Sequence, residues 1–216
     1  MIVVKKFVFN PFMENTYVVW DEETKDAMIV DPGCSNDNEE QMLTSFIEER
    51  NLEIKYMVNT HCHIDHFLGC RFVKEKYNPD YFVPENDFPL LQNAESQASM
   101  FGIEMKTPPG PDDYLSERKQ LSLGNCQIKL LFTPGHSPGE YSLYFEEEEF
   151  CITGDVLFQK NIGRTDLWEG NYDILIKSIK EKLFTLPDDV IVYSGHGENT
   201  TIGDEKLNNP FLKNLS

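Results

Sequence analysis

The sequence predicts one layered domain of mixed α and β structure covering residues 1–216. Short β-branched and aromatic runs alternate with helical patterns in both halves of the chain, which favours sheets covered by helices. With 216 residues, 40% of them hydrophobic, the chain is large enough to bury a core without disulfide bonds. Its five cysteines are odd in number and show no CxxC spacing, which predicts reduced thiols in a cytoplasm.

The first half of the chain starts with strands and then alternates with helices. Turn residues separate the expected strands at Ile2–Asn10, Thr16–Trp20, Ala27–Val30, Lys55–Asn59 and Tyr81–Val83. A helix is expected from Asn36 or Asp37 to about Arg50, because Asn and Asp cap helices and apolar residues recur on one face. A further helix is expected at Phe67–Tyr77 and a helical stretch from Glu85 to about Phe101, before a breaker-rich loop at Thr107–Asp113.

The second half repeats this alternation. Strands are expected at Gln127–Phe132, Tyr141–Phe145, Phe150–Thr153 and Val190–Tyr193, with a helix at Tyr172–Leu186. The acidic run Glu146–Glu149 lies between two strands and reads as a solvated hairpin tip.

Charge and hydropathy exclude two classes of partner. The formal net charge of −18 repels phosphate backbones, so no nucleic acid is expected. No apolar run approaches the ~18 residues that a membrane span needs, so no membrane is expected. The N-terminal run turns polar too soon for a signal peptide, which again favours a cytoplasmic protein.

The strongest chemical signal is a run of metal-ligand side chains directly after a predicted strand. Imidazole and carboxylate groups are the ligands that zinc and similar metals accept from proteins. His61 and His63 are two residues apart, so in an extended turn they face the same way and can share one ion. Asp65 and His66 follow where the chain begins to coil, and can reach a second ion. Cys62 faces the other way in such a turn and is not counted as a ligand.

The remaining histidines and one aspartate also follow predicted strands. His136 lies in the turn Thr-Pro-Gly-His-Ser-Pro-Gly, His196 lies in Ser-Gly-His-Gly, and Asp155 closes Thr-Gly-Asp. Strand ends along one edge of a sheet are where sites assemble, so we expect these residues to join the first cluster. All five histidines then occupy candidate ligand positions.

A serine-hydrolase interpretation fits the same region less well. Gly135–Gly139 satisfies G-x-S-x-G, and Ser137, Asp155 and His196 follow the order of an α/β-hydrolase triad. The residue after Ser137 is Pro138, which has no N–H for an oxyanion hole, and the next segment reads as a strand where the motif requires a helix. A triad would also leave the first histidine cluster unexplained.

The motifs T-H-x-H-x-D-H, G-H-S-P-G, T-G-D and G-H-G together resemble those of the metallo-β-lactamase-fold hydrolases. The chain is most similar to glyoxalase II-like (hydroxyacylglutathione hydrolase-like) proteins, in particular to the short bacterial form. This resemblance implies an α+β (αββα) fold, a four-layer sandwich of two β-sheets flanked by helices. It also implies a binuclear centre, with one metal on His61, His63 and His136, a second on Asp65, His66 and His196, and Asp155 as the bridge.

The implied activity agrees with the chemistry of the ligands. Two divalent ions lower the pKa of a bound water from ~15.7 towards about 7, which predicts attack of a metal-bridging hydroxide on an acyl carbonyl. Because every histidine is a ligand, the catalytic carboxylate that orients this hydroxide would be Asp65. Zinc is the default for nitrogen and oxygen ligands, and iron and manganese accept the same set.

Two alternatives stay open. Persulfide dioxygenases resemble the chain as well, and that resemblance implies a single iron on His61, His136 and Asp155. The presence of His66 and His196 favours the binuclear hydrolase. The third interpretation is a metal-binding protein without turnover.

The substrate is less constrained than the reaction. The resemblance implies a small-molecule acyl thioester, such as a glutathione thioester, while another thiol carrier, an ester or a lactone stays open. Arg164 can grip a substrate carboxylate or pair locally with Asp166, and we favour the local pair. Apolar residues of the segment 84–106 can line the pocket as a lid, but their helical spacing favours ordinary core.

Overall fold

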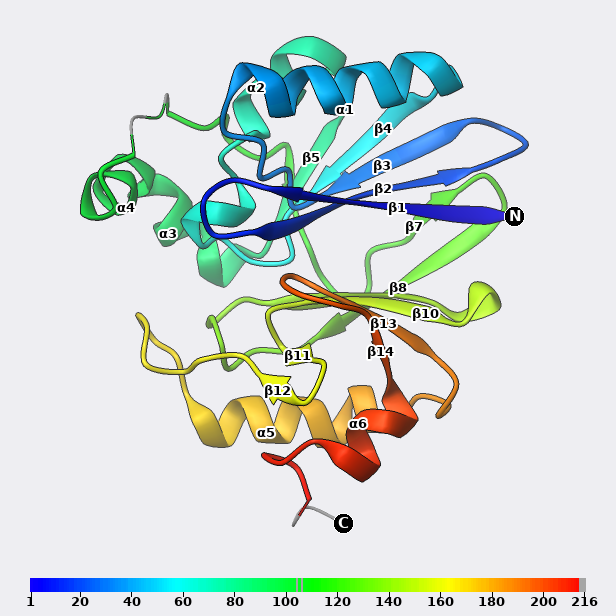
Figure 1. Cartoon of the computed structure of the whole chain (residues 1–216), viewed down its shortest axis with the longest axis vertical. Helices are drawn as coiled ribbons and strands as arrows, with labels where there is room; N and C mark the ends of the chain where they lie inside the picture. The colour runs from blue at the N-terminus through cyan, green and yellow to red at the C-terminus, as the bar shows by residue number, and fades with distance from the viewer. Residues whose placement is uncertain (104, 106, 214–216) are drawn as a thin grey trace. The chain divides into compact units, whose positions relative to one another are not determined.

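The computed structural model describes residues 1–103, 105 and 107–213 (Figure 1). The chain forms two compact units, Met1–Tyr114 with Ser122–Cys126 (unit 1) and Leu115–Leu121 with Gln127–Ser216 (unit 2). Two mixed six-stranded sheets are flanked by helices, which confirms the predicted α+β class. The single domain stays a prediction. Among the described residues, no helix has the length and apolar character needed to cross a membrane.

The sheet of unit 1 has its strands in sequence order. They are β1 (Ile2–Phe9), β2 (Glu14–Asp21), β3 (Asp26–Val30), β4 (Glu53–Val58), β5 (Asp80–Val83) and β6 (Asp113–Tyr114). The first three are antiparallel, whereas β3, β4, β5 and β6 run parallel. Parallel neighbours end at the same edge of a sheet, so the residues after β3 and β4 meet there.

Helix α1 (Asp37–Arg50) lies along one face of this sheet (Figure 1). The predicted cap is confirmed, because the Asn36 side chain accepts hydrogen bonds from the N–H groups of Asn38 and Glu39. Helix α2 (Cys70–Tyr77) begins three residues later than expected, since a 3-10 turn, η1 (Ile64–His66), precedes it. A Cβ at Gly69 would collide with Cys34 Sγ, so the backbone at Gly69 packs directly against the Cys34 side chain.

The helical stretch expected from Glu85 to about Phe101 is confirmed, as a 3-10 turn and two short helices, η2 (Glu85–Asp87), α3 (Phe88–Gln92) and α4 (Ala94–Met100). Asn93 separates α3 from α4, and its side-chain amide shares the Pro89 carbonyl with its own backbone N–H, at 2.7 Å and 3.2 Å. Leu91 is buried as core, whereas Met100 and Phe101 are exposed. Residues 104 and 106 of the predicted lid segment lie outside the described residues.

The second sheet has the order β14-β13-β10-β9-β8-β7. Its strands are β7 (Leu121–Leu123), β8 (Cys126–Phe132), β9 (Tyr141–Phe145), β10 (Phe150–Gly154), β13 (Ile191–Ser194) and β14 (Thr200–Thr201). A separate hairpin pairs β11 (Leu157–Phe158) with β12 (Asn161–Ile162). Strands β10 and β13 are parallel, which brings the residues after them to the same edge.

The helices of unit 2 are α5 (Tyr172–Glu181) and α6 (Ile202–Asn208). Leu175 and Ile179 of α5 pack with Val190 and Val192 in a buried apolar cluster. Helix α5 ends five residues before the expected boundary, and a 3-10 turn, η4 (Leu183–Thr185), follows it. The acidic run begins with another turn, η3 (Glu146–Glu148), in which no residue is buried, as predicted for a hairpin tip. All five cysteines of the chain are buried, and none of them forms a disulfide bond.

Candidate metal centre

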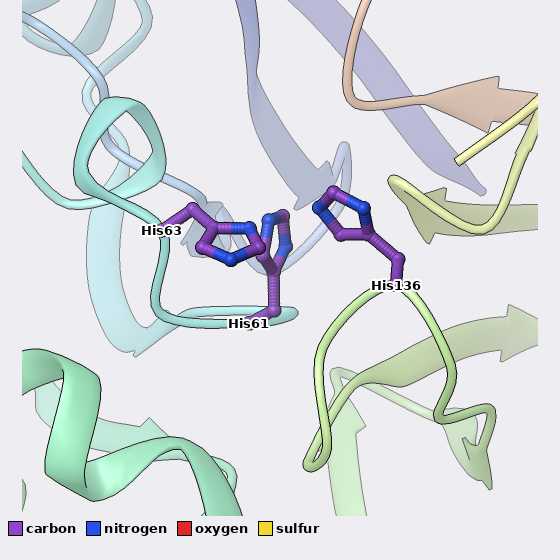
Figure 2. A group of neighbouring side chains, drawn as sticks. All are labelled: His61, His63 and His136. Carbon is purple, nitrogen blue, oxygen red and sulfur yellow. The ribbon is translucent and has the colours of Figure 1, made fainter. Parts of the chain in front are cut away.

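Four of the predicted ligands belong to unit 1, on the loop and 3-10 turn that follow β4. The rings of His61 and His63 lie 4.8 Å apart between centroids (Figure 2), and those of His61 and His66 lie 4.1 Å apart. All three histidines are buried, and Asp65 is partly buried beside them. Its Oδ2 lies 3.6 Å from His66 Nε2. The sequence run therefore folds into one compact group of ligand atoms.

Asp31 orients this group from the end of the neighbouring strand β3. Its carboxylate accepts from Thr60 N–H at 2.7 Å, from Thr60 Oγ1 at 2.6 Å and from His66 Nδ1 at 3.1 Å. Because the Thr60 hydroxyl donates to Asp31, it accepts from His61 Nδ1, which lies 3.1 Å away. Both rings then carry their proton on Nδ1, so each Nε2 presents a lone pair, as a metal ligand must.

Three predicted ligands belong to unit 2. His136 lies at the tip of the loop after β8 (Figure 2), Asp155 directly follows β10, and His196 follows β13. Asp155 Oδ2 lies 3.5 Å from His136 Nε2 and 3.7 Å from His196 Nε2. One carboxylate oxygen thus faces two imidazoles, which is the arrangement that a bridging ligand needs.

The ring orientation of His136 is fixed by the backbone. Its Nδ1 lies 2.7 Å from the Arg164 carbonyl oxygen, and a carbonyl only accepts, so Nδ1 carries the proton. Gly163, the residue before, packs so closely that a Cβ would collide with the Asp155 carbonyl and contact His136 Cβ. His136 Nε2 therefore directs its lone pair at Asp155.

This donor set fits a divalent metal. In unit 2 an imidazole lone pair and a carboxylate oxygen face each other, and the same holds for His66 and Asp65 in unit 1. Such pairs repel unless a cation lies among them, and N and O atoms from His and Asp are the ligands that zinc, iron and manganese accept. Within unit 1 alone, ligand atoms of Asp31, His61 and His66 lie within 4.8 Å of one another.

Glu14 is a buried carboxylic acid near the unit 1 group. Its Oε2 lies 2.8 Å from Thr16 Oγ1, which also contacts the Asp31 carbonyl at 2.8 Å and receives the Gly33 N–H at 2.9 Å. The single Thr16 proton must go to the Asp31 carbonyl, so the proton between Thr16 and Glu14 belongs to Glu14. Burial raises the pKa of Glu14 well above its usual range; His66 lowers this pKa and Asp31 raises it further.

Four residues of these groups were not predicted as functional: Glu14, Asp31, Thr60 and Glu140. Asp31 was interpreted only as the end of a strand. Because β3 and β4 are parallel neighbours, its position directly after β3 indicates that it lies near the ligands that follow β4. Glu140 is fully buried and accepts from the Asp155 N–H at 2.7 Å, which fixes the backbone of the bridging candidate. This contact joins residues 15 apart and leaves no local pattern.

The remaining sequence interpretations divide clearly. Arg164 donates from Nε and Nη2 to Asp166, each at 2.7 Å, which is the local ion pair that we favoured. A grip on a substrate carboxylate stays a prediction. Cys62 is fully buried in the unit 1 core, and β9 follows Ser137 where a nucleophile elbow would need a helix.

A family model for the metallo-β-lactamase superfamily matches residues 9–196, which is most of the chain. The chain belongs to the metallo-β-lactamase superfamily. Among curated relatives of this superfamily member, "Hydroxyacylglutathione hydrolase GloC" of Haemophilus influenzae is 39% identical over 95% of both chains.

Solved structures give the same fold. The chain matches the crystal structure of the B3 metallo-β-lactamase BLEG-1 with a TM-score of 0.89 and 33% identity, over 98% of this chain and 100% of that one. It matches TTHA1623, crystallised in a di-iron-bound form, with a TM-score of 0.86 and 32% identity, over 96% and 100% of the two chains. The metallo-β-lactamase fold predicted from the motifs is confirmed.

Proposed function

We propose that this chain is a hydrolase that uses two divalent metal ions to cleave a small acyl thioester. The observation that carries the proposal is the position of Asp155 Oδ2, 3.5 Å and 3.7 Å from the Nε2 atoms of two histidines. That arrangement fits a carboxylate shared by two ions. The relative named a hydroxyacylglutathione hydrolase supports a thioester as the substrate class.

We assign the ligands as the motif resemblance implies. One ion would be held by His61, His63 and His136, a second by Asp65, His66 and His196, with Asp155 shared. When bound, the two ions would supply an activated water and polarise the acyl carbonyl. The ligand geometry within each unit supports this assignment, because the Nδ1 protons of His61, His66 and His136 are already committed to acceptors.

The proton chemistry would then depend on carboxylates. In this assignment all five histidines would bind a metal ion through a ring nitrogen, so none would be free to act as a general base. Asp65 Oδ2 borders the group beside His66, so we assign Asp65 the role of orienting the attacking water and accepting its proton. The Arg164 carbonyl would act only on the ring orientation of His136.

The proposal is tested by metal analysis followed by assays on one preparation. We expect about two metal ions per chain and release of thiol from S-lactoylglutathione. Treatment with a chelator should abolish the release, and added zinc, iron or manganese should restore it. Two bound ions with no thiol release from any of a panel of acyl thioesters would overturn the proposal.

A second activity has a specific observation in its favour, the structural match to a B3 metallo-β-lactamase. Nitrocefin hydrolysis by the same preparation, faster than thioester hydrolysis, would favour a β-lactam substrate. A single iron per chain, with oxygen consumed on addition of a persulfide, would favour the dioxygenase. Bound metal without any of these reactions would leave a metal-binding protein.

A further inference from the structure

The carbonyl that orients His136 belongs to a loop that is itself held from a distance. Arg164 lies two residues after β12, and the turn of the β11–β12 hairpin passes through Lys160, which has a left-handed φ of 56°. A two-stranded hairpin of two residues per strand has little stability of its own. Contacts from outside the hairpin must therefore keep the Arg164 carbonyl in place.

Those contacts come from helix α6 and the residue that follows it. The Lys160 N–H donates to Glu205 Oε2 at 2.9 Å, and the Asn209 side-chain amide donates to the Asn161 carbonyl at 3.0 Å. The hairpin turn is thus bonded at two consecutive residues, once to a carboxylate and once to an amide. Neither bond belongs to the local β-ladder.

Glu205 is fully buried and its carboxylate is well supplied with donors. Besides the Lys160 N–H, it accepts from Thr200 Oγ1 at 2.5 Å and from Asn209 Nδ2 at 2.8 Å. Asn209 is also fully buried, and both of its amide protons are used, one on Glu205 and one on the Asn161 carbonyl. Burying a carboxyl group this deeply costs free energy unless hydrogen bonds satisfy its oxygens, and here they do.

We propose that Thr200, Glu205 and Asn209 form a C-terminal clamp whose task is to position His136. The clamp acts through the hairpin turn and the Arg164 carbonyl on the His136 ring, and touches no reacting atom. Its members are therefore positioning residues for a metal ligand. The consequence for catalysis rests on the proposed function, but the effect on the ring does not.

The test measures hydrogen exchange of the His136 ring Nδ1–H in metal-loaded protein with ¹⁵N-labelled histidine. The signal is assigned by its absence in His136→Ala. Glu205→Gln keeps the shape of the side chain but replaces one acceptor oxygen with an NH2 group, from which the Thr200 hydroxyl can turn to accept. The Lys160 N–H and the Asn209 amide are then left on an amide oxygen, which accepts more weakly than a carboxylate oxygen. We expect the His136 ring proton to exchange about tenfold faster or more in Glu205→Gln.

Two controls separate positioning from general destabilisation. The His66 ring proton, bonded to Asp31 in unit 1, should keep its exchange rate in Glu205→Gln. Lys206→Met removes the bonds from the same helix to Asp188 and the Leu186 carbonyl, and should leave the His136 ring unchanged. Equal acceleration at His136 and His66, or none at His136 in folded Glu205→Gln, would overturn the clamp.

A milder variant covers the case in which Glu205→Gln does not fold. Thr200→Val removes a single donor, and should accelerate exchange at His136 alone; an unchanged rate there would overturn the clamp. The proposed function fails separately. Wild-type protein without hydrolase activity, but with the expected exchange pattern, would retain the clamp and discard the hydrolase.

Discussion

Asp31 shows how much of the candidate metal centre depends on residues that bind no metal in our assignment. Its carboxylate accepts hydrogen bonds from Thr60 and His66, and the Thr60 hydroxyl in turn orients the His61 ring. Such partners of ligating histidines set the tautomer and raise the basicity of the ring, and their loss costs about 10–100-fold in metal affinity.

We therefore expect Asp31→Asn to weaken metal binding by about 10–100-fold, measured by competition with a chromophoric chelator. The substituted side chain has one acceptor oxygen and one NH2 group, so it cannot accept all three of the hydrogen bonds that the Asp31 carboxylate accepts. Asp26→Asn, at the other end of β3, is the matched control, because Asp26 makes only a partly exposed ion pair with Lys55. Equal affinities in the two variants would contradict this role for Asp31.

Glu14 gives a prediction about pH. Its raised pKa means that the folded protein holds this proton at a pH where the unfolded chain has released it, so stability falls as pH rises above the ordinary glutamate pKa of 4.5. Glu14→Gln donates to Thr16 without a titrating proton. Its stability relative to wild type should therefore rise with pH, by up to about 1.4 kcal/mol per pH unit.

Urea unfolding of both proteins between pH 4 and 8, at equal metal content, measures this difference. Glu23→Gln, at an exposed position in the turn between β2 and β3, serves as the control. A difference between Glu14→Gln and wild type that stays constant with pH would show that Glu14 is ionised in the folded protein.

At this scale the sequence allowed the ligands to be proposed but not their supports. His61, His63, Asp65 and His66 form one dense run, which chance does not produce easily. The supporting contacts of Glu14, Glu140 and Glu205 link residues brought together only by the fold, so each reads as an ordinary acidic residue in the sequence.

Among the elements, the β11–β12 hairpin packs closely against its neighbours in unit 2. A Cβ at Gly163, directly after β12, would collide with the Asp155 carbonyl and press on His136. We expect Gly163→Ala to lower the free energy of unfolding by about 1–3 kcal/mol and to weaken metal binding. Gly110→Ala is the matched control, because a Cβ there meets nothing within 4 Å. Similar metal affinity and stability in both variants would contradict this account.

The longer elements were predictable because their patterns are local. Alternation and capping placed most strands and α1 within a few residues of their observed bounds. The helical stretch at Glu85–Phe101 was predicted, but its interruption at Asn93 was not; there the side-chain amide and the backbone N–H share the Pro89 carbonyl. Two-residue strands such as β11, β12 and β14 carry too little sequence to form a period, so they were missed.

At the scale of the whole molecule, the charge of −18 opposes an anionic substrate. Four positive charges from two divalent ions would still leave about −14, so attraction to the site must be local. Raising the ionic strength shortens the screening length from about 30 Å at 0.01 M to about 8 Å at 0.15 M.

We expect kcat/KM for an anionic glutathione thioester to rise over this range of salt, because long-range repulsion is screened. A neutral thioester, assayed in parallel, should show little change. A fall in kcat/KM with salt for the anionic substrate alone would indicate a local cation that dominates its approach.

A metal titration with a coupled assay shows whether the chain holds a hydrolytic centre of two ions. Metal-stripped protein is titrated with zinc while bound metal and S-lactoylglutathione hydrolysis are measured together. We predict that hydrolysis is absent without metal and reaches its plateau at two ions per chain. A plateau at one ion, or no hydrolysis with two ions bound, would contradict the account.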